Sequence, residues 1–84
     1  MQHLYNSRKI VSLGGRHVRL GTYKHYKGNL YKITGLCTHT ETNEELVFYQ
    51  SLYDKYEFWV RPIEIFFSDV EFENKLQPRF SFVE

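Results

Sequence analysis

The stretch from Gly21 to Thr38, GTYKHYKGNLYKITGLCT, decides the fold expected for this chain. Two runs rich in β-branched and aromatic residues flank Lys27-Gly28-Asn29, and glycine accepts the positive φ that a tight turn needs. The sequence therefore predicts a hairpin with strands at Gly21–Tyr26 and Leu30–Thr38. Gly35, inside the second strand, indicates a bulge or sharp bend of the kind that curls a small barrel.

The second strand has one face that we expect to be buried, formed by Tyr31, Ile33, Gly35 and Cys37. Cys37 and His39 lie two residues apart, a spacing that puts their side chains on the same side of a strand and invites a Cys–His nucleophile. Burial raises the pKa of a thiol and makes it inert, so we interpret Cys37 as a small hydrophobic residue instead.

Further short strands separated by turns are predicted along the rest of the chain. The predicted elements are strands at Lys9–Leu13 and Arg16–Leu20 around Gly14-Gly15, strands at Glu45–Tyr53 and Phe58–Arg61, a helical turn at Pro62–Phe67, and a final hairpin of Val70–Phe72 with Arg79–Val83. The run Glu45–Tyr53 is apolar on both faces, which predicts a strand that is central or covered on both sides. Alanine is absent, and the whole pattern predicts an all-β barrel or roll of short antiparallel strands with at most one helical turn.

Length and composition bound the class of protein. Eighty-four residues make one domain with one small core, to which seven Tyr, seven Phe and one Trp can supply buried surface. The single cysteine cannot form an intramolecular disulfide, so we expect a cytoplasmic protein. The apolar runs are far shorter than the roughly 20 residues of a membrane span, so no membrane partner is expected.

Charge is divided unevenly along the chain. Residues 1–40 carry seven Lys or Arg, all four histidines and no Asp or Glu, whereas residues 41–84 carry ten Asp or Glu and four Lys or Arg. In an antiparallel barrel the basic strands lie beside later, acidic ones, so we expect cross-strand pairs of opposite charge to neutralise most of this asymmetry. Such pairing does not explain why basic and aromatic residues alternate in Tyr23–Lys27. If the basic half binds a partner, we expect the contact at this segment.

Several motifs follow one family pattern, in order and with matching gaps. They are G-x-Y-x-H-Y-K-G-x-x-Y over Gly21–Tyr31, His39-Thr40-Glu41-Thr42, Leu46-Val47-x-Tyr49, Leu52-Tyr53, Trp59-Val60-Arg61-Pro62 with Phe66, and Pro78-Arg79-Phe80. On these motifs, residues 21–82 resemble the bacterial domain-of-unknown-function 1653 family. The resemblance implies a small, mostly β, SH3-like barrel, and it implies no activity.

Two positions depart from the family pattern that the chain resembles. Cys37 stands where the family often has a small residue such as Ala, and Ile65 stands where Met is common; both are interpreted as packing variants. Residues 1–20 lie outside the pattern. We interpret them as an N-terminal extension that can add a hairpin to a single SH3-like domain at residues 21–84.

Polar-tipped aromatic and cationic side chains supply a candidate binding surface. We predict a non-catalytic groove for a peptide or a small polar ligand, formed by Tyr23, His25, Tyr26, His39, Glu41, Tyr49, Trp59 and Arg61. The competing interpretation is that aromatics fill a small core; it is favoured for Trp59, and the two weigh about evenly for Tyr23 and Tyr26. For Arg61, an internal ion pair with Glu41 or Glu64 is favoured over an external carboxylate or phosphate.

Alternative functions stay open. RNA or single-stranded nucleic acid could bind the basic half through Arg16, Arg19, Lys24, Lys27 and Lys32, with Tyr23 or Tyr26 stacking on bases. A small metal-dependent enzyme could use His25, His39 and Glu41, although their spacing favours hydrogen-bonding roles for the histidines. An assembly role could pair the basic half of one copy with the acidic half of another, and we expect a monomer or a weak homodimer.

The sequence lacks the common catalytic motifs, which argues against an enzyme. The sequence has no GxGxxG, P-loop, HExxH, GxSxG or CxxC pattern, so we expect no cofactor and lean away from catalysis. The loop His39–Thr42 is rich in side-chain oxygens that bond nearby backbone N–H groups, and we interpret it first as a structured turn.

Overall fold

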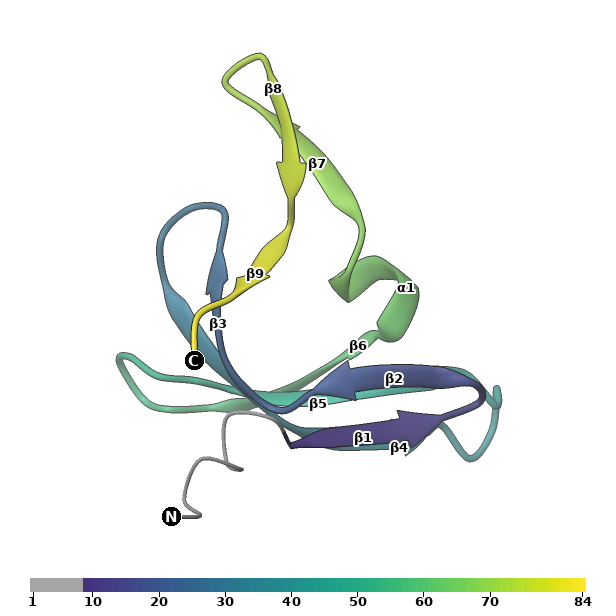
Figure 1. The fold of residues 1–84 in the computed structure, drawn as a ribbon. Helices are drawn as coiled ribbons and strands as arrows, with labels where there is room; N and C mark the ends of the chain where they lie inside the picture. The colour runs from purple at the N-terminus through teal and green to yellow at the C-terminus, as the bar shows by residue number, and fades with distance from the viewer. Residues whose placement is uncertain (1–8) are drawn as a thin grey trace, which may run out of the picture.

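Figure 1 shows the computed structural model, which describes residues 9–84 as a chain of short strands with one helical turn. The elements are β1 (Ile10–Leu13), β2 (Arg16–Arg19), β3 (Gly21–His25), β4 (Leu30–Thr38), β5 (Glu45–Ser51), β6 (Phe58–Pro62), α1 (Ile63–Phe66), β7 (Asp69–Phe72), β8 (Lys75–Pro78) and β9 (Phe80–Phe82). Every ladder among them is antiparallel. The all-β fold with one short helical turn is therefore confirmed.

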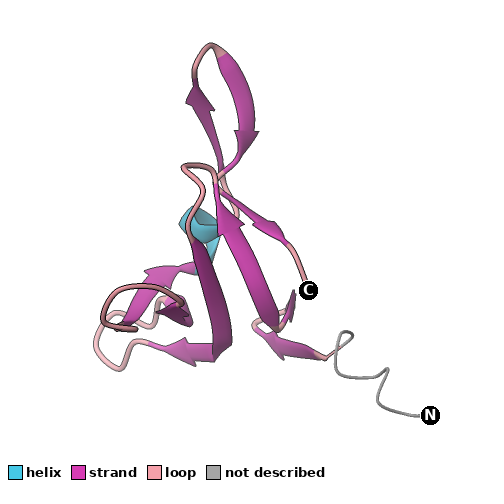
Figure 2. Ribbon diagram, turned by 90° about the vertical axis from the view of Figure 1, so that its left-hand side faces the viewer, coloured by secondary structure: helices cyan, strands magenta, loops and turns pink. Residues whose placement is uncertain are grey.

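The strands form one five-stranded sheet and two separate hairpins. The sheet has the order β6-β5-β4-β3-β9, and the hairpins are β1-β2 and β7-β8. The β1-β2 hairpin lies beside β4 and β5, while the β7-β8 hairpin extends away from the sheet in both views (Figures 1 and 2). In the described part of the chain no ladder joins β6 to β9, so these two strands are the edges of a curled but open sheet.

The hairpin of β3 and β4 is the predicted one, and its turn is organised by His25. The backbone N–H of His25 donates to the carbonyl of Asn29 (2.8 Å), and Gly28 N–H donates to the carbonyl of His25 (2.7 Å). The Nδ1 atom of His25 accepts the N–H of Lys27 (3.1 Å). Gly28 has φ of +112°, a value that L side chains rarely adopt, which explains why glycine stands at this turn.

The predicted bulge in β4 is present, and it changes which side chains face the core. The pairing of β4 with β5 shifts between Ile33 and Gly35. Because an extra residue reverses the alternation of side chains, Leu36 packs against the core opposite Val47. The expectation that Cys37 continues the buried face of Ile33 is therefore wrong, and Cys37 is only half-buried.

The C-terminal hairpin differs from the predicted one. Glu73 and Asn74 both have positive φ (53° and 62°) and form a two-residue turn that pairs Phe72 with Lys75. The strand predicted as the second arm, Arg79–Val83, instead contains β9, which returns to the main sheet and pairs with β3. The two turn residues with positive φ thus pair β7 with β8, and β9 joins the main sheet.

Aromatic and branched side chains from the main sheet, the β1-β2 hairpin and α1 meet in one core. Its buried members are Val18, Tyr23, Ile33, Val47, Tyr49, Ile63, Phe66 and Phe80. The rings of Phe66 and Phe80 stack with centroids 3.9 Å apart, so the short helix α1 is tied to β9. Val18, which is buried in this core, ties the β1-β2 hairpin to the sheet.

Opposite charges do not face each other as the sequence led us to expect. In the registers of the described ladders, no Lys or Arg stands opposite an Asp or Glu. Among residues 9–84 one ion pair forms, between Arg16 and Glu64 (3.8 Å), and it is solvent-exposed. The expected cross-strand neutralisation is therefore wrong.

Membrane insertion through a helix finds no support in residues 9–84. The helix that they contain, α1, has four residues, and none of the described chain offers a helix long and apolar enough to cross a bilayer.

Candidate functional site

A small hollow of about 200 Å³ opens on the inner face of the sheet near its β6 edge. Its walls are Tyr31 from β4, Tyr49 from β5, Tyr53 from the following loop, and Trp59 and Arg61 from β6. Residues opposite each other in an antiparallel ladder point to the same face. The pairs Tyr49↔Trp59 and Val47↔Arg61 therefore place the two β6 side chains on the core side of the sheet.

Arg61 supplies the positive charge of this aromatic pocket. Its Nε donates a hydrogen bond to the hydroxyl of Tyr49 (3.2 Å), and its Cζ lies 5.8 Å from the ring centroid of Phe80. No carboxylate pairs with Arg61 in residues 9–84, and residues 1–8 contain no Asp or Glu. The expected internal ion pair with Glu41 or Glu64 is therefore wrong, and Glu64 instead faces Arg16.

Two tyrosines close the wall opposite Arg61. The hydroxyls of Tyr31 and Tyr53 lie 2.6 Å apart, and their rings meet edge to face with centroids 5.5 Å apart. Burial, together with this hydrogen bond, raises the pKa of Tyr31 to about 12. The phenol of Tyr31 is therefore a neutral donor and acceptor at neutral pH.

Trp59 is the exposed member of the pocket. Its side chain is 48% exposed, so the interpretation that favoured a core position for it is wrong. The reason is its place on β6, which is an edge strand and has no neighbour on its outer side among the described residues. Trp59 therefore keeps about half of its surface accessible to solvent, in the pocket that it lines with Arg61.

His25 borders the pocket from the side of β3. Its ring centroid lies 6.2 Å from that of Tyr31 and 5.0 Å from that of Phe80. Burial lowers the pKa of His25, and the positive charges of Arg61, Lys27 and Arg79 lower it further. Three cationic side chains, Arg61, Lys27 and Arg79, therefore act on His25 at this end of the sheet.

The other predicted aromatics divide between the core and the β3-β4 turn. Tyr23 is 5% exposed and donates its hydroxyl to the carbonyl of Arg19 (2.8 Å), so it belongs to the core and not to a surface platform. Tyr26 packs against His25 (centroids 4.3 Å apart) and Phe72 (5.1 Å apart), and it joins the turn to the β7-β8 hairpin. Neither residue lines the aromatic pocket.

His39 and Glu41 lie far from the pocket, in the loop between β4 and β5. The Nδ1 atom of His39 accepts the N–H groups of Glu41 (3.1 Å) and Thr42 (3.3 Å), which makes the loop a structured turn. His25 and His39 stand near opposite ends of β4, whose nine residues would span roughly 25 Å if straight. The structure therefore does not bring His25, His39 and Glu41 together, and no metal-like group of three His, Cys, Asp or Glu forms in the described chain.

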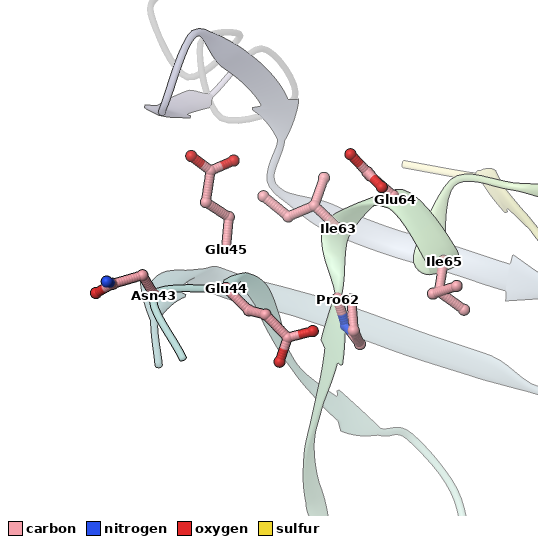
Figure 3. A pocket seen from close by; sticks show the side chains of 7 residues that line it. All are labelled: Asn43, Glu44, Glu45, Pro62, Ile63, Glu64 and Ile65. Atoms are coloured by element: carbon pink, nitrogen blue, oxygen red, sulfur yellow. The ribbon is translucent and has the colours of Figure 1, made fainter. Parts of the chain in front are cut away.

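A larger hollow of about 350 Å³ lies between the start of β5 and α1 (Figure 3). Its polar lining is acidic, with Glu44, Glu45 and Glu64, and the three carboxylates point in different directions (Figure 3). Glu45 lies against Gly14 and Glu64 pairs with Arg16. Since these carboxylates neither converge nor gather into a metal-like group within residues 9–84, the hollow is not a convincing site.

The structure thus assembles half of the predicted site and adds two residues. Tyr49, Trp59 and Arg61 meet in one pocket, with His25 at its border. Tyr31 and Tyr53 were missed. Tyr31 carries a signal that could have found it, since it lies on the same strand face as the buried Ile33 yet near the strand end, where a phenol can reach a rim.

Comparisons with known proteins identify a family and one close structure. The family described as "Protein of unknown function (DUF1653)" matches residues 21–82. A crystal structure of a DUF1653 protein from Bordetella bronchiseptica shares 37% sequence identity and superposes with a TM-score of 0.74, covering 79% of this chain and 87% of that one. No curated protein matches the chain.

Proposed function

Because the chain belongs to the DUF1653 family, whose description assigns no activity, we propose from its geometry that it is a binding module for a carboxylate-bearing ligand. The binding site is the aromatic pocket of Tyr31, Tyr49, Tyr53, Trp59 and Arg61. The ligand is a small polar acid or the acidic side chain of a peptide. This function makes no use of catalysis.

The observation that carries the proposal is the environment of Arg61. A guanidinium has five N–H donors and forms its strongest contacts with carboxylates in two-pronged fashion. Here the Nε is held by the neutral hydroxyl of Tyr49, and no carboxylate within residues 9–84 pairs with the group. A positioned cation without an anion in a pocket of aromatic walls is what the recognition of an external carboxylate requires.

The size and chemistry of the pocket favour binding over catalysis. A hollow of about 200 Å³ is smaller than the roughly 300–1,000 Å³ of a typical cofactor or drug site, so it fits one side chain or small acid. Its lining offers phenols, an indole and a guanidinium, and none of these is a general base near neutral pH. The raised pKa of Tyr31 makes that phenol a weaker acid, not an activated one.

A titration with benzoate tests the proposal. Benzoate carries a carboxylate on an apolar ring, and benzamide is its neutral counterpart. We expect benzoate, and not benzamide, to shift the NMR signals of the Trp59 indole, the Arg61 Nε and the His25 ring. Arg61→Gln should weaken benzoate binding at least about tenfold, whereas Arg16→Gln, which removes the same charge elsewhere, should not. Equal responses to benzoate and benzamide would reject the function.

A second candidate function, single-stranded nucleic-acid binding, is favoured by one specific observation on the opposite face of the sheet. The register aligns Lys32, Gln50 and Phe58 across three strands. The exposed ring of Phe48 stacks on that of Phe58, with centroids 5.3 Å apart. Stacked aromatic rings near a lysine are the kind of groups that bind bases and phosphates.

Salt dependence separates this candidate from the first. Binding of a thymidine oligonucleotide of about ten nucleotides should fall steeply with salt and should be lost in Phe58→Ala and weakened in Lys32→Gln. Lys55→Gln, which removes a charge from the loop after β5, is the matched control. Absence of binding even at low salt would leave only the carboxylate pocket.

A further inference from the structure

The outer strand β6 presents an unusual edge. Of the two edges of the main sheet, β9 has three residues and β6 has five. Four of the five β6 side chains are apolar or aromatic, and Phe58, Trp59 and Val60 are 56%, 48% and 56% exposed. Unpaired edges with exposed apolar residues are templates for another strand, which proteins normally guard against.

The register identifies which backbone groups of β6 are free. Ser51 N–H donates to the carbonyl of Glu57 (2.9 Å), and the two residues extend the register that pairs Gln50 with Phe58. Hydrogen-bonded and non-hydrogen-bonded pairs alternate along an antiparallel ladder. Trp59 and Arg61 therefore direct their backbone groups to β5, while Phe58 and Val60 direct their N–H and C=O groups to the open edge.

The side chains of a strand added at this edge would meet two different surfaces. Positions beside Trp59 and Arg61 point toward the aromatic pocket, which these two residues line. Positions beside Phe58 and Val60 point to the other face, where the ring of Phe58 stacks with that of Phe48. An extended segment would thus meet a cation on one face and an apolar strip on the other.

The positive charge of Arg61 favours a segment that carries carboxylates at this edge. Arg61 has no carboxylate partner within residues 9–84, and Arg61, Lys27 and Arg79 together make the surroundings of His25 positive. A second copy of the chain would bring another Arg61 to the same short edge, where like charges repel. A segment with carboxylates on one face complements the edge, and apolar residues between them match Phe58 and Val60.

We propose that β6 binds an extended acidic peptide by strand addition, with backbone hydrogen bonds to Phe58 and Val60 and an Asp or Glu side chain at Arg61. The inference rests on the proposed function, because it assigns the carboxylate to a peptide side chain. Main-chain hydrogen bonds give such a complex its affinity, and alternate side chains give it specificity. Pro62, which lacks an N–H, ends the available edge, so the contact is confined to Phe58–Arg61.

Val60→Pro tests strand addition without replacing any residue that lines the pocket. Proline removes the Val60 N–H that faces the open edge, and edge strands accept proline at such positions. The probe is a peptide of about nine residues with glutamate at alternate positions and valine or threonine between them. Wild-type protein should bind it, Val60→Pro should bind it about tenfold more weakly, and Val60→Ile, which keeps both the N–H and an apolar β-branched side chain, should bind it normally.

Benzoate separates the failure of this inference from the failure of the proposed function. If Val60→Pro keeps benzoate binding and loses the peptide, strand addition is supported. If it binds both as the wild type does, strand addition is wrong and the carboxylate pocket stands. If benzoate fails to bind the wild-type protein at all, the proposed function is wrong, and the inference falls with it.

Modified peptides supply a readout that needs no protein variant. N-methylation of successive peptide residues should weaken binding at every second position, because only those N–H groups face β6. A uniform effect along the peptide would overturn strand addition, as would full binding of the peptide with glutamine in place of glutamate. Dimerisation of the wild-type protein that Val60→Pro abolishes would also overturn it, in favour of a second copy at the edge.

Discussion

The Nε of Arg61 donates a hydrogen bond to the hydroxyl of Tyr49 over 3.2 Å. Tyr49 is 5% exposed and stands on β5, the strand between β4 and the edge strand β6, so its phenol is a fixed anchor for a side chain on β6. The bond orients the guanidinium but leaves its charge uncompensated, because the acceptor is neutral. The core thus positions the cation, and the edge makes it accessible.

Tyr49→Phe should separate positioning from charge. The variant removes one hydrogen bond to a charged group and should lower the free energy of unfolding by about 1–3 kcal/mol. Benzoate affinity should fall severalfold, since Arg61 keeps its charge but loses its orientation. Urea unfolding and NMR titration measure the two effects. A benzoate affinity equal to that of the wild type would show that Arg61 needs no anchor.

His25 should make the free energy of unfolding depend on pH in the mildly acidic range. Its pKa is lowered from 6.5 in the folded protein, first by burial and then by Arg61, Lys27 and Arg79. As the pH falls below 6.5, the unfolded chain takes up the proton first, so the free energy of unfolding decreases until the folded pKa is passed. Urea unfolding at several pH values should show this loss.

A pair of variants isolates the contribution of His25. His25→Asn, whose side chain can still accept a turn N–H, should flatten the pH dependence below 6.5, whereas His17→Asn should leave the part due to His25 unchanged. Bound benzoate should raise the pKa of His25, because an anion offsets the field of Arg61. An unchanged His25 titration in saturating benzoate would mean that the anion binds elsewhere.

Tyr31 should make the free energy of unfolding depend on alkaline pH. Its pKa is raised from 10.0 to about 12 by burial and by the hydrogen bond with Tyr53. The folded state therefore holds the phenol proton more tightly, and this contribution is complete below pH 10 and is lost as the pH rises toward 12. Tyrosinate absorbance should show Tyr31 ionising earlier in Tyr53→Phe. An identical titration in this variant would contradict the role of the hydrogen bond.

The sequence predicts local elements of this protein better than their long-range partners. The hairpin of β3 and β4 follows from Gly28 and the alternation around it, and the bulge follows from Gly35. Turn chemistry is local, so it can be read from neighbouring residues. The pairing of β9 with β3 is not local. The turn at Glu73-Asn74 pairs β7 with β8, whereas the sequence pattern predicts that this strand pairs with Arg79–Val83.

The sequence predicts which types of residue form the candidate site, but not which individual residues meet there. Aromatic and arginine residues pointed to Tyr49, Trp59 and Arg61, which register and strand order bring together. The exposure of Trp59 depends on β6 being an edge, which no residue of β6 reveals by itself. His39, which we expected beside the other site residues, instead accepts N–H groups of its own loop, a local role that the sequence alone does not distinguish from ligand binding.

The turn of the β1-β2 hairpin offers a test of how the hairpin is held on the sheet. Gly14 and Gly15 have φ of +57° and +81°, so both positions favour glycine. They differ in their surroundings, because a Cβ at Gly14 would collide with the carboxylate of Glu45, whereas a Cβ at Gly15 meets nothing within 4 Å. Because these contacts are with the far end of a flexible side chain that can move aside, Gly14→Ala should destabilise the protein only slightly more than Gly15→Ala.

The difference between the two variants should disappear when Glu45 is shortened. Each alanine carries the backbone cost of a positive φ, roughly 1 kcal/mol, and only Gly14→Ala adds the collision with Glu45. In a Glu45→Ala background the collision is gone, so both glycine variants should lose similar free energies of unfolding, measured by urea denaturation. Contacting residues are expected to show such non-additivity. Additive effects of Gly14→Ala and Glu45→Ala would instead place the turn away from β5.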